Sequence, residues 1–257
     1  MNPDLCWRVE AACLAAFPAT QEQTLAGWHL RRSGGSTRRT NSANPGRNAG
    51  PAIAVLATAR VFYARHDQPV IVRVPDIVPT LDAELDAAGF GPAEAPTATL
   101  YAERLDTSPR AASGIVVGSD RPGIAWLTAR AALSGASATD EAVFAAMAEA
   151  LAGPVRFVGI AEGTHLVAIA YGAIRGGLLV IESVATAPSA RRRGHGRTLV
   201  AALSAWGATM GASGACLQVV RDNAPARALY HDLGFVRMLY GCHYRRPPPS
   251  DEPGSPA

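Results

Sequence analysis

The chain has 257 residues, and its 24 lysine and arginine residues against 21 aspartate and glutamate residues give a formal net charge of +3. A hydrophobic content of 48% and a charged content of 18% are typical of a soluble globular protein with one large or two modest domains. The mild charge argues against a protein that binds polyanions, and no apolar stretch reaches membrane-spanning length. The start lacks the basic region of a signal peptide, and the four cysteines lack metal-ligand spacing. We therefore expect a cytoplasmic protein with reduced thiols, no metal and no membrane partner.

Hydrophobic periodicity in the first half predicts helices that alternate with short strands. The expected elements are a helix at 3–17, a strand at 27–32 with a hairpin turn at 33–36, a polar loop at 41–46, a helix at 51–65, a strand at 70–74, a helix at 78–88 and a strand at 97–101. The stretch 108–114 contains serine, proline and glycine, a composition typical of a linker. We therefore expect a first domain at 1–107.

The second half begins with two predicted helices and continues with strands. Its expected elements are helices at 120–133 and 139–151, strands at 155–161, 165–173 and 178–187, a helix at 198–206, a strand at 215–220, a helix at 223–230 and a strand at 235–245. We expect this second domain to span 115–246. The proline-rich tail at 247–257 cannot bury a core, and we expect it to be disordered.

A basic, glycine-containing loop follows the strand at 178–187. Gly194 and Gly196 can adopt positive φ and let a phosphate approach the backbone, and Arg191–Arg193 and Arg197 can pair with it. Strand, loop and helix together make an anion site, since the first helical turn presents unpaired N–H groups. The Walker and dinucleotide patterns do not fit, because the loop lacks Gly-Lys-Ser/Thr and position 199 is leucine. Taken alone, the loop is equally compatible with a solvated turn before an ordinary helix.

The longer segment resembles the core of the GNAT superfamily of acyl-CoA-dependent N-acetyltransferases. Arg191, Gly194 and Gly196 match its Arg/Gln-X-X-Gly-X-Gly/Ala signature. Its later block is matched by Asn223, Ala226, Leu229-Tyr230 and Gly234-Phe235. The resemblance covers roughly residues 115 to 246. It implies an α/β (α+β) class fold with a mixed, mostly antiparallel twisted sheet flanked by helices, and acetyl-CoA as cosubstrate.

The resemblance also implies which residues meet the cofactor. Backbone groups of the strand before the loop pair with the pantetheine arm and the thioester carbonyl, and the loop holds the phosphates. The implied residues are Val184, Ala185, Thr186, Arg191, Arg192, Arg193, Gly194, His195, Gly196, Arg197 and Asn223. His195 is expected to contribute only its backbone N–H. Asn223 either bonds the cofactor arm or serves as a helix N-cap, and both roles are compatible.

Two side chains are candidates for proton transfer. An amine acceptor must lose a proton, and Glu182 is the acidic residue in the strand that leads to the loop. Its alternative reading is a solvated or edge-facing glutamate. The departing thiolate must gain a proton, and Tyr230 stands where the superfamily carries its general acid. Its alternative reading is a ring that packs under the helix.

An internal repeat links the two halves. When Gly89-Phe90 is aligned with Gly234-Phe235, Val74 falls on Val219 and Leu85 on Tyr230. With a one-residue shift, the segment 47–52 echoes the segment 191–196, although Pro51 has no N–H to offer a phosphate. The first half therefore resembles a degenerate second copy, as in tandem GNAT proteins. Coincidence is the alternative, because Gly-Phe after a helix is common.

These patterns predict an enzyme that transfers an acetyl group from acetyl-CoA to a primary amine of a small-molecule or peptide acceptor. A non-catalytic acyl-CoA-binding or regulatory module is the alternative. No nucleic-acid partner is expected, because acidic runs at 82–86 and 140–149 dilute any basic face. The basic patch formed by Arg31, Arg32, Arg38 and Arg39 is expected to be solvated or to lie between the domains.

Overall fold

The computed structural model describes residues 2–106 and 115–248. Its helices are α1 (Pro3–Ala16), α2 (Ile53–Ala64), α3 (Leu81–Ala87), α4 (Ile124–Ser134), α5 (Ala138–Glu149), α6 (His195–Thr209) and α7 (Ala224–Asp232), with short 3-10 helices η1 (Arg38–Thr40) and η2 (Pro188–Ala190). Its strands are β1 (Gln21–Leu25), β2 (Trp28–Arg32), β3 (Ala43–Pro45), β4 (Val72–Pro75), β5 (Glu94–Ala102), β6 (Ile115–Ser119), β7 (Val155–Glu162), β8 (His165–Arg175), β9 (Leu178–Thr186), β10 (Ala215–Val220) and β11 (Arg237–Arg245).

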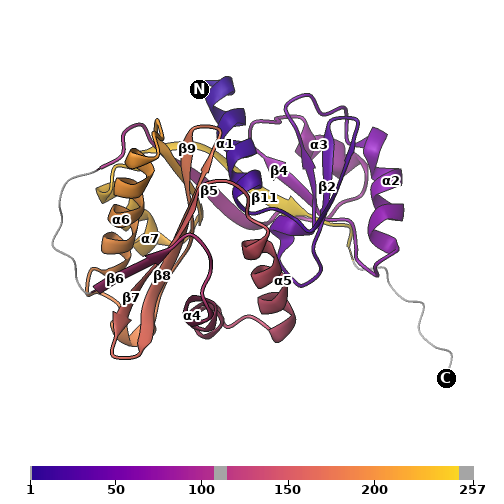
Figure 1. Ribbon diagram of the computed structural model, residues 1–257. Helices are drawn as coiled ribbons and strands as arrows, with labels where there is room; N and C mark the ends of the chain where they lie inside the picture. The colour runs from indigo at the N-terminus through magenta and orange to yellow at the C-terminus, as the bar shows by residue number, and fades with distance from the viewer. Residues whose placement is uncertain (1, 107–114, 249–257) are drawn as a thin grey trace.

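All of these strands form a single sheet in the order β1-β2-β3-β4-β11-β5-β10-β9-β8-β7-β6. The last strand of each half lies among the strands of the other half. β5 pairs antiparallel with β10 and β11, and β11 also pairs antiparallel with β4. In Figure 1 the yellow β11 reaches across the molecule to the side of the purple β4. The two halves are therefore joined by exchanged strands rather than set side by side as separate sheets.

Helices cover both faces of the part of the sheet built by the second half. One apolar cluster lies under α6 and α7, and a second lies under α1, α4 and α5. The first helix of the chain belongs to this second cluster, since α1 contacts β8, β9 and β10. A third cluster fills the space between α2, α3 and the strands β2 to β4. Figure 1 shows α1 between the two halves.

The predicted fold class is confirmed, and two local predictions are wrong. The hairpin turn is not at 33–36: it is the two-residue turn Ala26-Gly27, with φ of 48° and 78°, which joins β1 to β2. Positive φ at both positions suits the twist of a tight hairpin. The predicted polar loop at 41–46 contains β3, which pairs with β2 despite its Asn-Pro sequence. The predicted linker at 108–114 and most of the tail lie outside the described residues.

The internal repeat has a matching local geometry in both halves. Gly89 and Gly234 have φ of 76° and 91°, and each ends a helix in the left-handed region that favours glycine. The following Phe90 donates its N–H to the carbonyl of Leu85 at 3.0 Å, as Phe235 does to the carbonyl of Tyr230 at 3.0 Å. The two segments therefore fold in the same way, with leucine in one copy where the other has tyrosine.

Across residues 2–106 and 115–248, no helix has the length and apolar character needed to cross a membrane. The same residues contain no group of three or more His, Cys, Asp or Glu side chains arranged to hold a metal ion.

Candidate functional site

Strands β9 and β10 separate in the middle of the sheet. Their parallel pairing ends with Leu217 opposite Ile181, whereas β9 continues to Thr186 along its other neighbour, β8. Ser183 has φ of +53°, and the β8–β9 register shifts between Ile169 and Tyr171. This is a β-bulge, which bends a strand and re-aims its backbone groups. Beyond it, residues 184–186 run beside β8 without a β10 partner in the described sheet.

The loop after β9 gives the start of α6 a backbone geometry that suits an anion. Arg192 and Gly194 have φ of 64° and 83°, and Gly194 is the N-cap residue of α6. No side chain caps this helix. Helix N-termini carry partial positive charge and N–H groups that point at an anion. At Gly196 an added Cβ would lie 3.1 Å from Leu229 Cδ2, so glycine gives the backbone its close approach to α7.

A cavity of about 920 Å³ connects the parted strands to this loop. Every predicted cofactor-binding residue except Arg193 lines it, as does Tyr230. Arg193 instead pairs with Glu162 at the end of β7, with Nη2 2.8 Å from Oε1. The His195 ring is buried and lies 3.2 Å from the same carboxylate through Nε2. Glu162 thereby holds the back of the loop against β7, so that Arg191, Arg192 and Arg197 remain on the cavity side.

Tyr230 lies on α7 and is 7% exposed. Burial, and to a smaller extent the negative charge of Glu182, raise the pKa of Tyr230 to about 12. The Phe235 ring packs against it edge-on, with centroids 6.1 Å apart. This geometry is compatible both with a Tyr230 ring that only packs under the helix and with a Tyr230 hydroxyl that donates a proton. Asn223 caps α7, because its Oδ1 accepts the N–H of Ala226 at 3.2 Å, and it also lines the cavity.

The cavity includes residues that the sequence analysis did not single out. They come from α4 and α7 and the turn before α6: Leu133, Ala190, Pro225, Ala228 and Asp232. Asp232 pairs with Arg197 at 2.8 Å and holds that side chain beside α7. The α7 residues could have been predicted from helical spacing, since positions 225, 228, 229 and 232 lie on one face of the helix, the face toward the loop. No sequence pattern predicted Leu133 as a cavity residue, because α4 is separated from the loop by about sixty residues of sequence.

The comparisons identify the family. The family model described as "Probable histone acetyltransferase Rv0428c C-terminal" matches residues 7–245. The chain belongs to this acetyltransferase family. A GCN5-related N-acetyltransferase from Kribbella flavida has a similar structure, with a TM-score of 0.67 at 22% identity over 96% of this chain and 95% of that one. A tandem GNAT protein from the clavulanic acid biosynthesis pathway gives 0.65 at 16% identity, over 98% and 89%. The search of curated proteins gave no match.

The structural likenesses establish the GNAT fold. The two halves of the chain differ at the start of the helix that follows the basic loop or its counterpart, α6 in the second half and α2 in the first. At the start of α2, the N–H of Ala52 donates to Glu84 Oε2 at 2.6 Å, and Thr80 donates to the other oxygen at 2.9 Å. In the repeat, Glu84 corresponds to Leu229, which packs beside Gly196 in the second copy. In the first half, a carboxylate of the protein itself thus accepts the N–H group at the start of the helix, where the repeat would place an anion.

Glu182 is not among the residues that line the cavity of this GNAT fold. Its carboxylate faces the other side of β9, where Arg39 donates to Oε1 at 2.6 Å and to Oε2 at 2.7 Å. Burial by itself would lower the pKa of the Arg39 guanidinium, but the negative charge of Glu182 and its hydrogen bonds hold that pKa above its usual value. For Arg39, the expectation of a position between the halves is confirmed. The assignment of Glu182 as general base stays a prediction.

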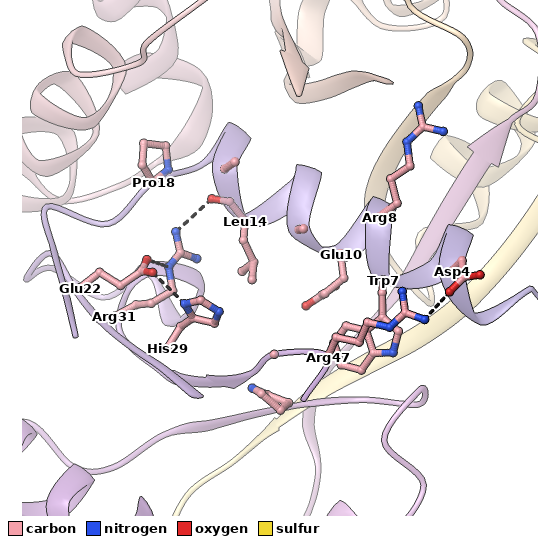
Figure 2. Close-up of a pocket in the computed structure, with 14 residues that line it drawn as sticks. Asp4, Trp7, Arg8, Glu10, Leu14, Pro18, Glu22, His29, Arg31 and Arg47 are labelled. Atoms are coloured by element: carbon pink, nitrogen blue, oxygen red, sulfur yellow. Dashed lines mark hydrogen bonds and ion pairs between the residues drawn. The ribbon is translucent and has the colours of Figure 1, made fainter. Parts of the chain in front are cut away.

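A second cavity, of about 550 Å³, lies between α1 and the strands β2 and β3 (Figure 2). Several of its charged side chains pair with one another. Glu22 contacts His29 Nδ1 at 2.8 Å and Arg31 Nε at 3.3 Å, and Asp4 pairs with Arg47. Arg31 is buried rather than solvated, because carbonyl oxygens of Leu14, Phe17 and Arg39 also accept from its guanidinium. The walls of this cavity are therefore electrically balanced, unlike the arginine-lined cavity of the second copy.

Proposed function

We propose that this chain is an acetyl-CoA-dependent N-acetyltransferase that acylates a primary amine. One observation carries the proposal. The parted strands β9 and β10 open directly onto an uncapped helix N-terminus that is flanked by three arginines and faces Tyr230 across a cavity of about 920 Å³. A cosubstrate that is a long, narrow arm ending in phosphates needs this combination: a slot in the sheet, backbone donors along it and an anion site at its end.

The residues divide the binding task between them. The N–H groups at the start of α6, with Arg191, Arg192 and Arg197, hold the pyrophosphate. On the side of β9 that has no β10 partner, backbone groups of the stretch Val184, Ala185 and Thr186 extend the hydrogen bonding of the strand to the pantetheine arm. An N–H group in this stretch stabilises charge on the thioester oxygen, a contribution of about 3–4 kcal/mol for one such donor.

Tyr230 supplies the proton for the leaving group. The amine nitrogen attacks the carbonyl carbon, so that a C–N bond forms while the C–S bond breaks. The Tyr230 hydroxyl protonates the departing sulfur, and the amine proton leaves to water. A phenol whose pKa is raised to about 12 stays protonated at neutral pH, so its proton is in place when the thiolate forms beside it.

The test is a transfer assay with the purified chain, acetyl-CoA and a panel of primary amines, read as release of free CoA. Tyr230→Phe is expected to lower kcat about 10²–10⁴-fold with little change in the affinity for acetyl-CoA. Tyr101→Phe is the matched control, because Tyr101 is equally buried but lies on β5, away from the cavity. Unchanged turnover in Tyr230→Phe would remove the acid role. Release that never exceeds hydrolysis with any amine would favour the non-catalytic acyl-CoA-binding module.

A further inference from the structure

One side chain of the first half reaches the strand that forms the proposed acetyl-transfer site. Arg39 follows β2 by a short connection and is 17% exposed, and its partner Glu182 on β9 is 7% exposed. Both guanidinium Nη atoms donate, one to each carboxylate oxygen, at 2.6 and 2.7 Å. Such two-pronged contacts fix the direction of a carboxylate as well as its place. Arg39 and Glu182 are 143 residues apart in sequence.

Arg39 is itself held by the first helix and the residue after it. Its Nη2 donates to the carbonyl of Cys13 at 3.2 Å, and its guanidinium carbon lies 4.9 Å from the centre of the Phe17 ring. α1 in turn packs against β8, β9 and β10. The guanidinium therefore sits between a helix that rests on the sheet and the strand below it, and it has little freedom to follow Glu182 if that strand moves.

Glu182 occupies a particular place in β9. Ile181 is the last residue that pairs with β10, and Ser183 carries the positive φ of the bulge. Glu182 is thus the first residue of β9 without a β10 partner, immediately before the strand changes direction. Its backbone pairs with Tyr171 of β8, and the next pair in this ladder, Ile169 with Ala185, lies beyond the bulge. The anchoring that β10 no longer provides is replaced here by a side chain.

We propose that Arg39 is a positioning residue for acetyl transfer: by clamping Glu182 it fixes the bulge at Ser183, and so aims the backbone groups of residues 184–186 that meet the thioester. This proposal rests on the function proposed above. It gives the first half a role in the reaction, although its own anion site is filled by Glu84. It also assigns to Glu182 a structural task that a free general base does not perform.

The test compares Arg39→Gln with Arg38→Gln. Arg38 is the adjacent arginine, is 37% exposed and pairs with Glu94 at 2.7 Å within the first half, so its loss removes the same charge without touching β9. Arg39→Gln is expected to lower kcat about tenfold to hundredfold, because displacements of the order of 1 Å at a reacting centre have effects of this size. Its affinity for CoA without the acetyl group should stay near wild type, because the phosphates bind at α6.

Amide hydrogen exchange gives a readout that does not depend on turnover. Peptides covering residues 182–187 should exchange faster in Arg39→Gln and unchanged in Arg38→Gln. Arg39→Lys keeps the charge but loses the two-pronged contact, and it should fall between wild type and Arg39→Gln in both measurements. This variant keeps the comparison available if Arg39→Gln folds poorly.

The outcomes separate the two proposals. If the wild-type chain transfers acetyl to no amine, the proposed function fails, while exchange in β9 still decides whether Arg39 holds the strand. If Arg39→Gln and Arg39→Lys exchange and turn over like wild type, the positioning role is wrong. It is also wrong if Glu182→Gln abolishes the acidic limb of the pH–rate profile while Arg39→Gln leaves kcat unchanged, because that pattern belongs to a general base.

Discussion

Glu10→Gln should destabilise the whole molecule. Glu10 lies on α1 and accepts from Arg73 of β4 at 2.8 and 2.9 Å and from the Tyr240 hydroxyl of β11 at 2.6 Å. Glu10 and Arg73 are each 1% exposed. Glutamine has nearly the same shape, so the substitution opens no cavity, but it leaves the Arg73 charge buried and unpaired and turns an amide N–H₂ toward it.

The size of the effect follows from that burial. Breaking one partner out of a buried ion pair costs about 3–5 kcal/mol of unfolding free energy. For a chain of this length each kcal/mol corresponds to a shift in Tm of about 2–4 °C, which gives a decrease of about 6–20 °C. The loss should appear in a single transition, because the three residues come from α1 and from strands of both halves of one sheet.

The assay is urea unfolding followed by circular dichroism, with thermal unfolding as a second measure. Glu103→Gln is the control. Its carboxylate contacts Arg237 at 3.2 Å but is 73% exposed, so its removal should change the unfolding free energy by no more than about 0.5 kcal/mol. A loss below about 1 kcal/mol in Glu10→Gln would refute the reasoning, because it would mean that Arg73 finds water or another partner.

Three further results are expected. Burial alone would raise the pKa of Glu10, but Arg73 and Tyr240 hold it below its usual value of 4.5. The stabilisation is therefore present above pH 4.5 and is lost as the pH falls through the lower folded pKa, and acid titration of stability should be flatter in Glu10→Gln. Because the pKa of Tyr230 is raised to about 12, its hydroxyl stays protonated up to pH 10, and kcat should not fall through loss of this proton in that range. A fall in kcat near pH 9 that depends on Tyr230 would contradict the burial argument. Asn223→Ala should lower the unfolding free energy by about 0.5–2 kcal/mol, measured by urea unfolding, because α7 loses its cap.

The sequence could predict the position of the glycine-containing loop between β9 and α6 because its signal is local. Gly194 and Gly196 stand within a few residues of the strand and the helix they join, and glycines at this spacing indicate a tight turn between the two. Most helices were also predictable from periodicity, although α6 begins at His195 rather than 198, since its first turn is basic and glycine-containing instead of apolar. Local composition therefore located the element but not its first turn.

The remaining features depend on partners far away in the chain. Nothing in the pattern of β5 or β11 says that each pairs across the boundary between the halves, because alternation predicts a strand but not its neighbour. Arg39 and Glu182 are 143 residues apart, and nothing in the sequence around either residue predicts that they pair with each other. β3 escaped notice because its three residues include Asn44 and Pro45, and its pairing is set by β2. Likewise, the role of Glu84 becomes visible only when α3 lies against the start of α2.

The most direct test of the account is a calorimetric titration of acetyl-CoA into the purified chain, with Gly196→Asp alongside. We expect one site per chain, because Glu84 fills the anion position of the first copy, and we expect Gly196→Asp to abolish binding by placing a carboxylate where the phosphates lie. Two sites, or binding that survives Gly196→Asp, would contradict the assignment of the cosubstrate to the cavity between β9, the basic loop and α7. No binding by the wild-type chain would contradict the proposed acetyl transfer itself.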